Sequence, residues 1–270
     1  MATIPGQCKF CKILSLAATA PTLLFLPGTL CDARAWEKAC QALRGDWPRV
    51  FVDYRFEESI SAMAAKALAS VDGAVIPIGL SMGGIVALEI WRQAAGRVTA
   101  LAIFDTDPGA DTLERRRKRD AQIRSATEGD FCAMVKSQLI PGYFSTIQPS
   151  GAWLNDTVIA MALDQGVAAF AAQSTALTTR RDAWSLLKGI SVPTLVACGA
   201  DDRICPPETH ECMAALLRIL TFAVIPNAGH LAPLEQPKAT TRVLERWLDG
   251  VTIGASEPAR GLQDSPFNSR

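Results

Sequence analysis

Short apolar runs alternate with helix-like segments along most of this chain, and this alternation constrains the fold more than any other feature. The runs that we expect to be buried strands are 22–26, 49–53, 74–78, 98–104, 193–198 and 220–225. Parallel strands need a crossover connection, which is usually a helix. The pattern therefore predicts an α/β protein with a mostly parallel sheet of about six strands and helices on both faces.

One long stretch interrupts the alternation after the fourth expected strand. From about residue 110 to residue 190 the sequence contains only helical segments, broken at Pro141-Gly142 and again near residue 150. We therefore expect a core over 21–109 and 191–250, with a helical cap inserted over 110–190. Residues 1–20 are expected to be irregular, and the polar segment 251–270 is expected to be disordered.

Charge and hydropathy exclude several classes of partner. The chain has 27 Lys and Arg against 27 Asp and Glu, so no net field favours nucleic acid or an anionic membrane. No apolar run reaches the ~18 residues that a membrane span needs. The basic run at 114–120 is interpreted as a solvated helix face. We expect a small-molecule partner, with no nucleic acid and no membrane, and a monomer or homodimer.

The eight cysteines are scattered and predict neither a disulfide framework nor a metal site. Cys8 and Cys11 form a lone C-x-x-C, whereas a zinc site needs about four ligands. Free thiols indicate a reducing compartment, and we expect a cytoplasmic protein without a bound metal. Secretion is the alternative, because Lys9 and Lys12 precede a short apolar stretch and the small-x-small sequence at 18–20.

The pentapeptide Gly79-Leu80-Ser81-Met82-Gly83 joins an expected strand to an expected helix. An attacking serine must stand clear of the sheet on a tight strand-to-helix turn, so the positions around it must be small. The start of the helix also supplies free N–H groups where negative charge develops. Ser81 is therefore the candidate nucleophile. The alternative is a glycine-rich turn with an idle serine.

A serine needs a base, and the base needs an acid that orients it. The chain has two histidines. His230 follows the last expected strand, at the sheet edge where parallel-sheet enzymes keep their sites. His210 lies in a polar helix and is expected to be solvated, so His230 is the candidate base. For the acid, Asp201 and Asp202 follow the fifth strand, and the alternative position after the fourth strand holds Asp105 and Asp107.

These residues resemble the α/β-hydrolase superfamily, in which the triad runs in the order serine, acid, histidine. The resemblance covers residues 22–249. Within the superfamily, the chain is similar to a branch of small capped bacterial esterases that includes pimeloyl methyl ester esterases. It is carried by Leu26–Trp36 as the oxyanion loop, Gly79–Gly83 as the nucleophile elbow, Gly199–Pro206 as the acid loop G-x-x-D-x-x-x-P, and Gly229-His230. That acid loop implies Asp202.

The resemblance also implies the remaining parts of a site. The oxyanion donors would be the backbone N–H groups of Met82 and Thr29, with Leu30 as the alternative to Thr29. The family's usual His-Gly is Pro27-Gly28 here, which a loop that acts through backbone N–H groups tolerates. The sheet would be trimmed to about six strands, because little chain precedes residue 22.

The function that follows is hydrolysis of a carboxylic ester through an acyl-enzyme on Ser81, with no cofactor. Apolar cap residues should line an acyl pocket, and we name Leu30, Phe144 and Trp153 as substrate-binding residues. A small to medium, largely apolar ester is expected. The same triad also serves thioesterases, lactonases, haloperoxidase-like esterases and enzymes that cleave carbon–carbon bonds. A non-catalytic binding protein on this scaffold and a redox or metal protein built on Cys8 and Cys11 are the alternatives from other classes.

Overall fold

A single sheet of six parallel strands forms the centre of the protein. The computed structural model describes residues 20–147 and 151–256. The strands lie in the order β2-β1-β3-β4-β5-β6, which confirms the predicted class and number of strands. Their bounds are β1 Thr22–Leu26, β2 Arg49–Phe51, β3 Val75–Leu80, β4 Leu101–Phe104, β5 Thr194–Gly199 and β6 Leu220–Ile225.

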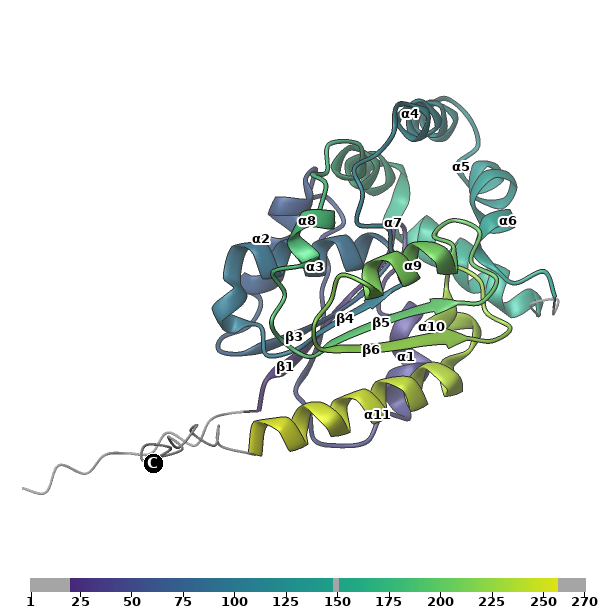
Figure 1. Cartoon of the computed structure of the whole chain (residues 1–270). Helices are drawn as coiled ribbons and strands as arrows, with labels where there is room; N and C mark the ends of the chain where they lie inside the picture. Colours follow the sequence, from purple (N-terminus) through teal and green to yellow (C-terminus); the bar gives the residue numbers. More distant parts are fainter. Residues whose placement is uncertain (1–19, 148–150, 257–270) are drawn as a thin grey trace, which may run out of the picture.

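Helices cover both faces of this sheet (Figure 1). One face carries α2 (Ile60–Ala69), α3 (Met82–Ala94), α8 (Trp184–Leu187) and α9 (Pro207–Ala214), and the other carries α1 (Arg34–Gln41), α10 (Ala232–Glu235) and α11 (Pro237–Ser256). Successive strand residues alternate between the two cores. Leu23 and Phe25 pack with α1 and α11, whereas Leu24 and Leu26 pack with α2 and α3. Both faces of the four central strands β1, β3, β4 and β5 are therefore buried, as their continuous apolar sequences require. The edge strand β6 is partly buried on one face and exposes Leu220, Phe222 and Val224 on the other.

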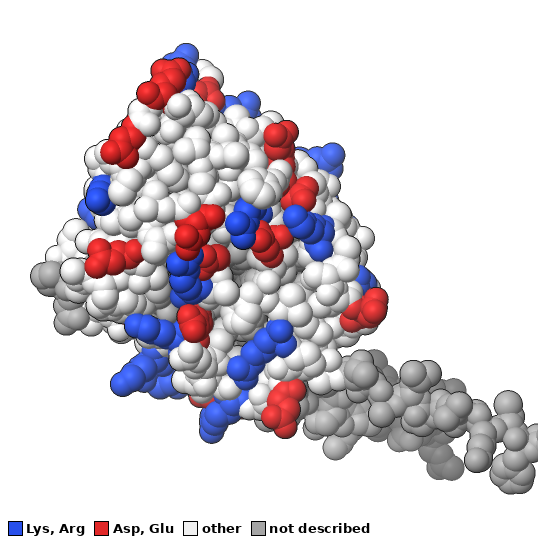
Figure 2. All heavy atoms as spheres, turned by 180° about the vertical axis from the view of Figure 1, so that it is seen from behind, with Lys and Arg blue, Asp and Glu red and all other residues white. Residues whose placement is uncertain are grey.

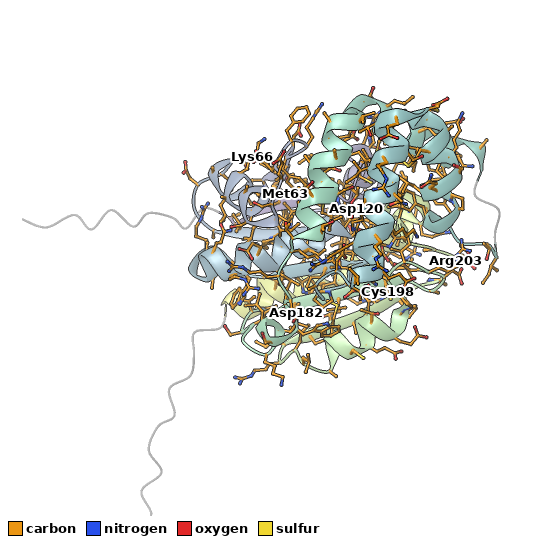
Figure 3. The ribbon with its side chains drawn as sticks, turned by 90° about the horizontal axis from the view of Figure 1, so that it is seen from above. Met63, Lys66, Asp120, Asp182, Cys198 and Arg203 are labelled. Atoms are coloured by element: carbon orange, nitrogen blue, oxygen red, sulfur yellow. The ribbon has the colours of Figure 1, made fainter. Side chains whose placement is uncertain are left out.

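The segment between β4 and β5 is helical and forms a cap over the carboxyl ends of the strands (Figures 1 and 3). The cap consists of α4 (Leu113–Glu128), α5 (Phe131–Met134), the π-helical turn η2 (Val135–Leu139), α6 (Ile140–Tyr143) and α7 (Ala152–Thr178). Among the described residues no strand occurs between Phe104 and Thr194. The long helix α7 bends at Gly166, whose φ is 82°.

The two ends of the chain differ in what the structure describes. Disorder was predicted from residue 251 onwards, but helix α11 continues to Ser256, so residues 251–256 are helical. Val251 still packs against the core, which extends the helix beyond the point where the sequence becomes polar. Residues 1–19, with Cys8 and Cys11, and residues 257–270 lie outside the described part, so the expectations for these segments remain expectations.

The structure shows how charged side chains are distributed over one face of the molecule and whether any described helix could span a membrane. Figure 2 shows acidic and basic side chains interspersed over the face opposite to that of Figure 1. None of the described helices is both long enough and apolar enough to cross a membrane.

Candidate active site

Ser81 lies at the tight turn between β3 and α3. Its φ is 55°, an unfavourable conformation for a residue with a side chain, and such strain concentrates at functional sites. A Cβ on Gly79 would lie 2.2 Å from the Gly83 carbonyl oxygen, and a Cβ on Gly83 would lie 2.1 Å from that of Leu26. Both positions therefore require glycine, and the pentapeptide pattern has a steric cause.

His230, in the loop after β6, contacts the Ser81 side chain. Its Nε2 atom lies 2.8 Å from Ser81 Oγ, and its Nδ1 atom lies 2.8 Å from Asp202 Oδ2. A carboxylate can only accept, so Nδ1 carries the proton and Nε2 accepts from the serine hydroxyl. His230 is 3% exposed. The arrangement presents a serine hydroxyl to a base whose tautomer is fixed.

Asp202 is held by the loop that follows β5. Its Oδ1 atom accepts the N–H groups of Ile204, at 2.8 Å, and Cys205, at 3.0 Å, which leaves Oδ2 for His230. The neighbouring Asp201 points elsewhere and accepts the Ser145 hydroxyl at 2.5 Å. Of the two adjacent aspartates, Asp202 is the one that forms a hydrogen bond with His230.

The alternative acids after β4 serve other groups. Asp105 is fully buried and accepts the backbone N–H groups of Gly199 and Ala232. Burial and the neighbouring charge of Asp202 raise the pKa of Asp105 well above its usual range. Asp107 accepts the N–H of Gly109 and pairs with Arg115. Neither carboxyl contacts His230.

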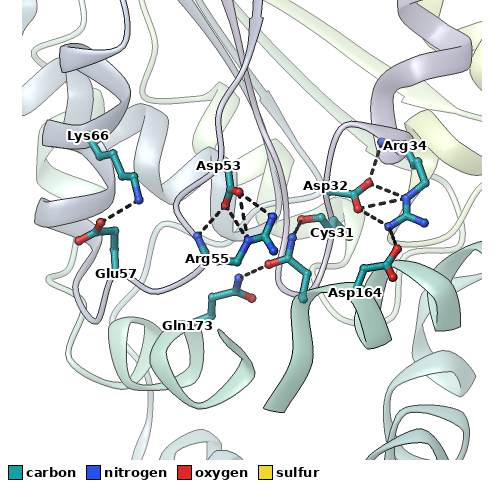
Figure 4. Close-up of polar contacts among 10 residues, drawn as sticks. Cys31, Asp32, Arg34, Asp53, Arg55, Glu57, Lys66, Asp164 and Gln173 are labelled. Atoms are coloured by element: carbon teal, nitrogen blue, oxygen red, sulfur yellow. Dashed lines mark hydrogen bonds and ion pairs between the residues drawn. The ribbon is translucent and has the colours of Figure 1, made fainter. Parts of the chain in front are cut away.

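Two backbone N–H groups close to Ser81 have no hydrogen-bond partner among the described residues, those of Thr29 and Met82. The alternative donor, the Leu30 N–H, is occupied, because it donates to Gln173 Oε1 on α7 at 2.8 Å. Gln173 also contacts Gln165, which in turn donates to the Cys31 carbonyl (Figure 4). The cap thus holds the oxyanion loop through two glutamines that the sequence analysis did not single out.

The expectation that His210 is solvated is wrong. Its side chain is fully buried on the inner face of α9, beside Met213. Its Nε2 atom accepts the Thr106 N–H at 2.9 Å, and its Nδ1 atom lies 3.2 Å from the Pro206 carbonyl. The Thr106 hydroxyl in turn donates to the carbonyl of Ser81 or Phe104. His210 is therefore connected through Thr106 to the backbone of the turn at Ser81. The polar residues around His210 in the sequence gave no indication that its side chain is buried.

We expect His210 to make the fold sensitive to acid. Burial lowers the pKa of His210 below its ordinary value of 6.5. A group with a lowered pKa in the folded state contributes stability above the unfolded pKa, and this contribution is lost as the pH falls towards the folded pKa. Urea unfolding at pH 7.5 and pH 5.5 should show a smaller loss of unfolding free energy in His210→Gln than in the unmodified protein. Equal losses would contradict the assignment.

A cavity of about 400 Å³ opens above Ser81 and His230, between the cap and the sheet. The three residues that we named for substrate binding do not line it. Leu30 packs into the cap's own apolar cluster, Phe144 packs into the core, and Trp153 is 42% exposed beneath the Lys38 ammonium. The apolar lining consists instead of Met82, Ile85, Leu139, Tyr143, Phe170, Leu177, Ile204 and Leu231.

The cavity is also more basic than the sequence suggested. Arg115, Lys118 and Arg119 belong to the run interpreted as a solvated face, yet they line the cavity. Arg180, after α7, and Arg203, from the loop after β5, line it as well. Figure 3 marks Arg203 and, on α4, Asp120. Because α4 is polar on every side, its sequence gives no sign of which side covers a cavity.

One group of possible metal ligands occurs among the described residues. The ligand atoms of Asp202, Cys205 and His230 lie within 4.8 Å of one another. Both oxygens of Asp202 already accept hydrogen bonds, and burial raises the pKa of the Cys205 thiol well above its usual range. A metal would need the thiolate and would displace the histidine bond, so these donors fit the hydrogen-bonded arrangement better.

Comparison with known proteins shows the family of the chain. The model of the alpha/beta hydrolase family matches residues 23–243. The chain belongs to the alpha/beta hydrolase family. A Bacillus subtilis protein named as a putative 2-succinyl-6-hydroxy-2,4-cyclohexadiene-1-carboxylate synthase is 28% identical to this chain over an alignment of 185 residues. The alignment covers 64% of this chain and 65% of the relative, so the chain spans less than two thirds of the length of that protein.

Two further relatives span most of the chain. A 3-oxoadipate enol-lactonase from Acinetobacter baylyi is 23% identical over 248 residues, covering 86% of this chain and 90% of the relative. A thermophilic esterase from Thermogutta terrifontis, solved with malate bound, superposes with a TM-score of 0.80 at 28% identity, covering 86% of this chain and 92% of the esterase. This hydrolase family therefore includes esterase and enol-lactonase relatives of the chain.

Proposed function

We propose that this hydrolase cleaves carboxylic esters of small molecules, with Ser81 as nucleophile, His230 as general base and Asp202 as the orienting acid. The observation that carries the proposal is the continuous chain of hydrogen bonds from Ser81 Oγ through the imidazole to Asp202, with 2.8 Å at each step. An activated serine requires this geometry, because a free hydroxyl is a weak nucleophile at neutral pH.

In the first half of the reaction His230 takes the proton from Ser81 as Oγ attacks the ester carbonyl. The free N–H groups of Thr29 and Met82 face the developing oxyanion, and such donors contribute roughly 3–4 kcal/mol each in comparable sites. The tetrahedral intermediate then collapses, and the imidazolium gives its proton to the departing alcohol. Asp202 stabilises the imidazolium without itself being protonated.

The second half returns the enzyme to its starting state. Water enters the cavity and gives a proton to His230 as it attacks the acyl carbonyl on Ser81. The same N–H groups stabilise the second oxyanion. As the intermediate collapses, the bond between the acyl carbon and Ser81 Oγ breaks, the imidazolium of His230 returns its proton to Oγ, and the carboxylic acid leaves. Each step uses groups that the chain itself supplies, so the proposed cycle needs no cofactor.

Lactone hydrolysis is the second candidate, because the enol-lactonase relative aligns over 86% of the chain. A lactone is a cyclic ester and would follow the same steps. Thioester hydrolysis and carbon–carbon bond cleavage would use the same nucleophile and base.

A substrate panel tests the proposal. Purified protein should show its highest kcat/KM on open-chain esters such as 4-nitrophenyl butyrate, with lower values on S-ethyl thiobutyrate and on δ-valerolactone. The measurement is the rate of acid release by pH-stat titration, which follows all three substrates in the same way. Turnover of the lactone alone would replace ester hydrolysis with the second candidate, and no turnover of any compound would contradict both.

A further inference from the structure

A buried cluster of opposite charges lies on the cap side of the cavity. Asp111 has no exposed side-chain surface, and its two oxygens bind two arginines. Oδ1 accepts from Arg180 Nη1 at 2.5 Å, and Oδ2 accepts from Arg119 Nε at 2.6 Å. Both arginines line the cavity that contains Ser81. The single carboxylate of Asp111 therefore holds two guanidinium groups in place at the cavity that Ser81 lines.

This cluster carries a surplus of positive charge. Arg119 and Arg180 share one carboxylate, and Arg115 is balanced by Asp107. Lys118, which lines the same cavity, forms no ion pair within the described part of the chain. Arg203 also lines the cavity, so five cations line it, against the two carboxylates of Asp107 and Asp111.

The guanidinium groups also keep unused donors. Arg180 uses Nε on the Gly109 carbonyl and Nη1 on Asp111, while its Nη2 has no partner among the described residues. Towards the described part of the chain, Arg119 donates through Nε alone, which leaves both of its terminal nitrogens without a partner there. The side chain of Arg180 is only 3% exposed, but its Nη2 atom is not completely buried and keeps access to solvent.

Maintaining this surplus in a half-enclosed cavity is unfavourable without a counter-charge. Transfer of a charge out of water is costly unless the charge is paired. In agreement, burial lowers the pKa of Arg180, and this effect exceeds the opposing influence of the Asp111 carboxylate. Guanidinium groups with free terminal nitrogens bind carboxylate and phosphate oxygens through paired hydrogen bonds. An anionic ligand group would satisfy both the charges and the donors.

We infer that the substrate is an ester with a second, negatively charged end, a carboxylate or a phosphate, that binds Arg119 and Arg180 while its ester carbonyl lies at Ser81. Leu139, Phe170 and Leu177 line the same cavity and would contact a short hydrocarbon chain between the two ends. This inference rests on the proposed ester hydrolysis and replaces the largely apolar ester expected from the sequence. Monoesters of dicarboxylic acids are the simplest substrates of this kind.

The test compares esters that differ in charge alone. Monomethyl adipate and methyl adipamate have the same length, and they differ by a carboxylate against a neutral amide. The acid ester should have a kcat/KM at least about 10-fold higher, the factor expected for hydrogen bonds to a charged group. Methyl 4-(phosphonooxy)butanoate forms a second arm, and the larger gain identifies carboxylate or phosphate as the preferred group.

Variants on α4 connect the preference to the cluster. Arg119→Gln should reduce the acid-to-amide ratio of kcat/KM about 10-fold, and Arg119→Lys should restore part of it. Arg117→Gln is the matched control, because Arg117 lies on the same helix but is exposed and does not line the cavity. The control should keep the ratio of the unmodified protein. Thermal melting of each variant verifies that Arg119→Gln is folded.

The outcomes separate the inference from the function on which it rests. If 4-nitrophenyl acetate is hydrolysed and neither charged ester is preferred to the amide, the charged-substrate inference is overturned and ester hydrolysis stands. If Arg119→Gln and Arg117→Gln lower the ratio equally, the cluster is not the binding site. If no ester is hydrolysed, the proposed function itself fails.

Discussion

Replacing Ser81 with alanine should reduce kcat for 4-nitrophenyl acetate by about 10,000-fold or more. The substitution removes the proposed nucleophile and leaves the proposed oxyanion donors, the N–H groups of Thr29 and Met82, in place. Within the described ranges 20–147 and 151–256, Ser81 Oγ forms a hydrogen bond with His230 alone, so the fold should survive the change. The measurement is the release of 4-nitrophenolate under saturating substrate, with thermal melting of both proteins.

A cap serine provides the control for this variant. Ser137 is exposed, and among the residues that the structure describes its hydroxyl donates only to the Ala133 carbonyl, within its own helical segment. Ser137→Ala should keep the rate of the unmodified protein. Activity of Ser81→Ala within tenfold of the unmodified protein would show that another group carries the reaction.

Replacing Asp202 with asparagine should lower kcat by about 1,000- to 10,000-fold. An asparagine can place its amide NH₂ where Oδ2 now accepts from His230. The imidazole would then carry its proton on Nε2, which could no longer accept the proton of Ser81. The variant keeps the shape of the residue, so the loss should appear in kcat and not in the melting temperature. Steady-state kinetics on 4-nitrophenyl acetate measures it.

The adjacent Asp201 is a matched control for this change. Its carboxylate accepts the Ser145 hydroxyl, and an asparagine oxygen can accept the same bond. Asp201→Asn should therefore retain activity within about threefold, the effect of replacing a charged hydrogen-bond acceptor with a neutral one. A loss in Asp201→Asn as large as that in Asp202→Asn would mean that the orienting acid has been misassigned.

The sheet and the arrangement around Ser81 could be predicted because their causes are local in the sequence. Buried parallel strands require continuous apolar runs, and the nucleophile turn requires glycine where a Cβ would lie 2.1 Å from the Leu26 carbonyl. Parallel strands also place their carboxyl ends at one edge. Residues that follow β3, β5 and β6 in the sequence are therefore brought to one side of the molecule.

The cap could not be predicted in the same way, since its contacts join distant segments. Gln173 binds the Leu30 N–H across 143 positions, and no local pattern relates them. Arg119 belongs to a charged helix, and only the fold brings it to Asp111 beside Arg180. The burial of His210 could not be predicted for the same reason, because its hydrogen-bond partner Thr106 lies 104 positions away in the sequence. In the proposed function the choice of substrate depends on such contacts, so the sequence alone gives little basis for predicting it.

The most direct test of the account is to map the site of reaction with a fluorophosphonate probe. Such a probe reacts with a serine that an adjacent base activates. Intact-mass and peptide mass spectrometry of the purified protein should show one adduct, located on Ser81, which is absent from Ser81→Ala and strongly reduced in a His230→Gln variant. An unlabelled protein, or an adduct on any other residue, would contradict the claim that Ser81 is the nucleophile of a serine hydrolase.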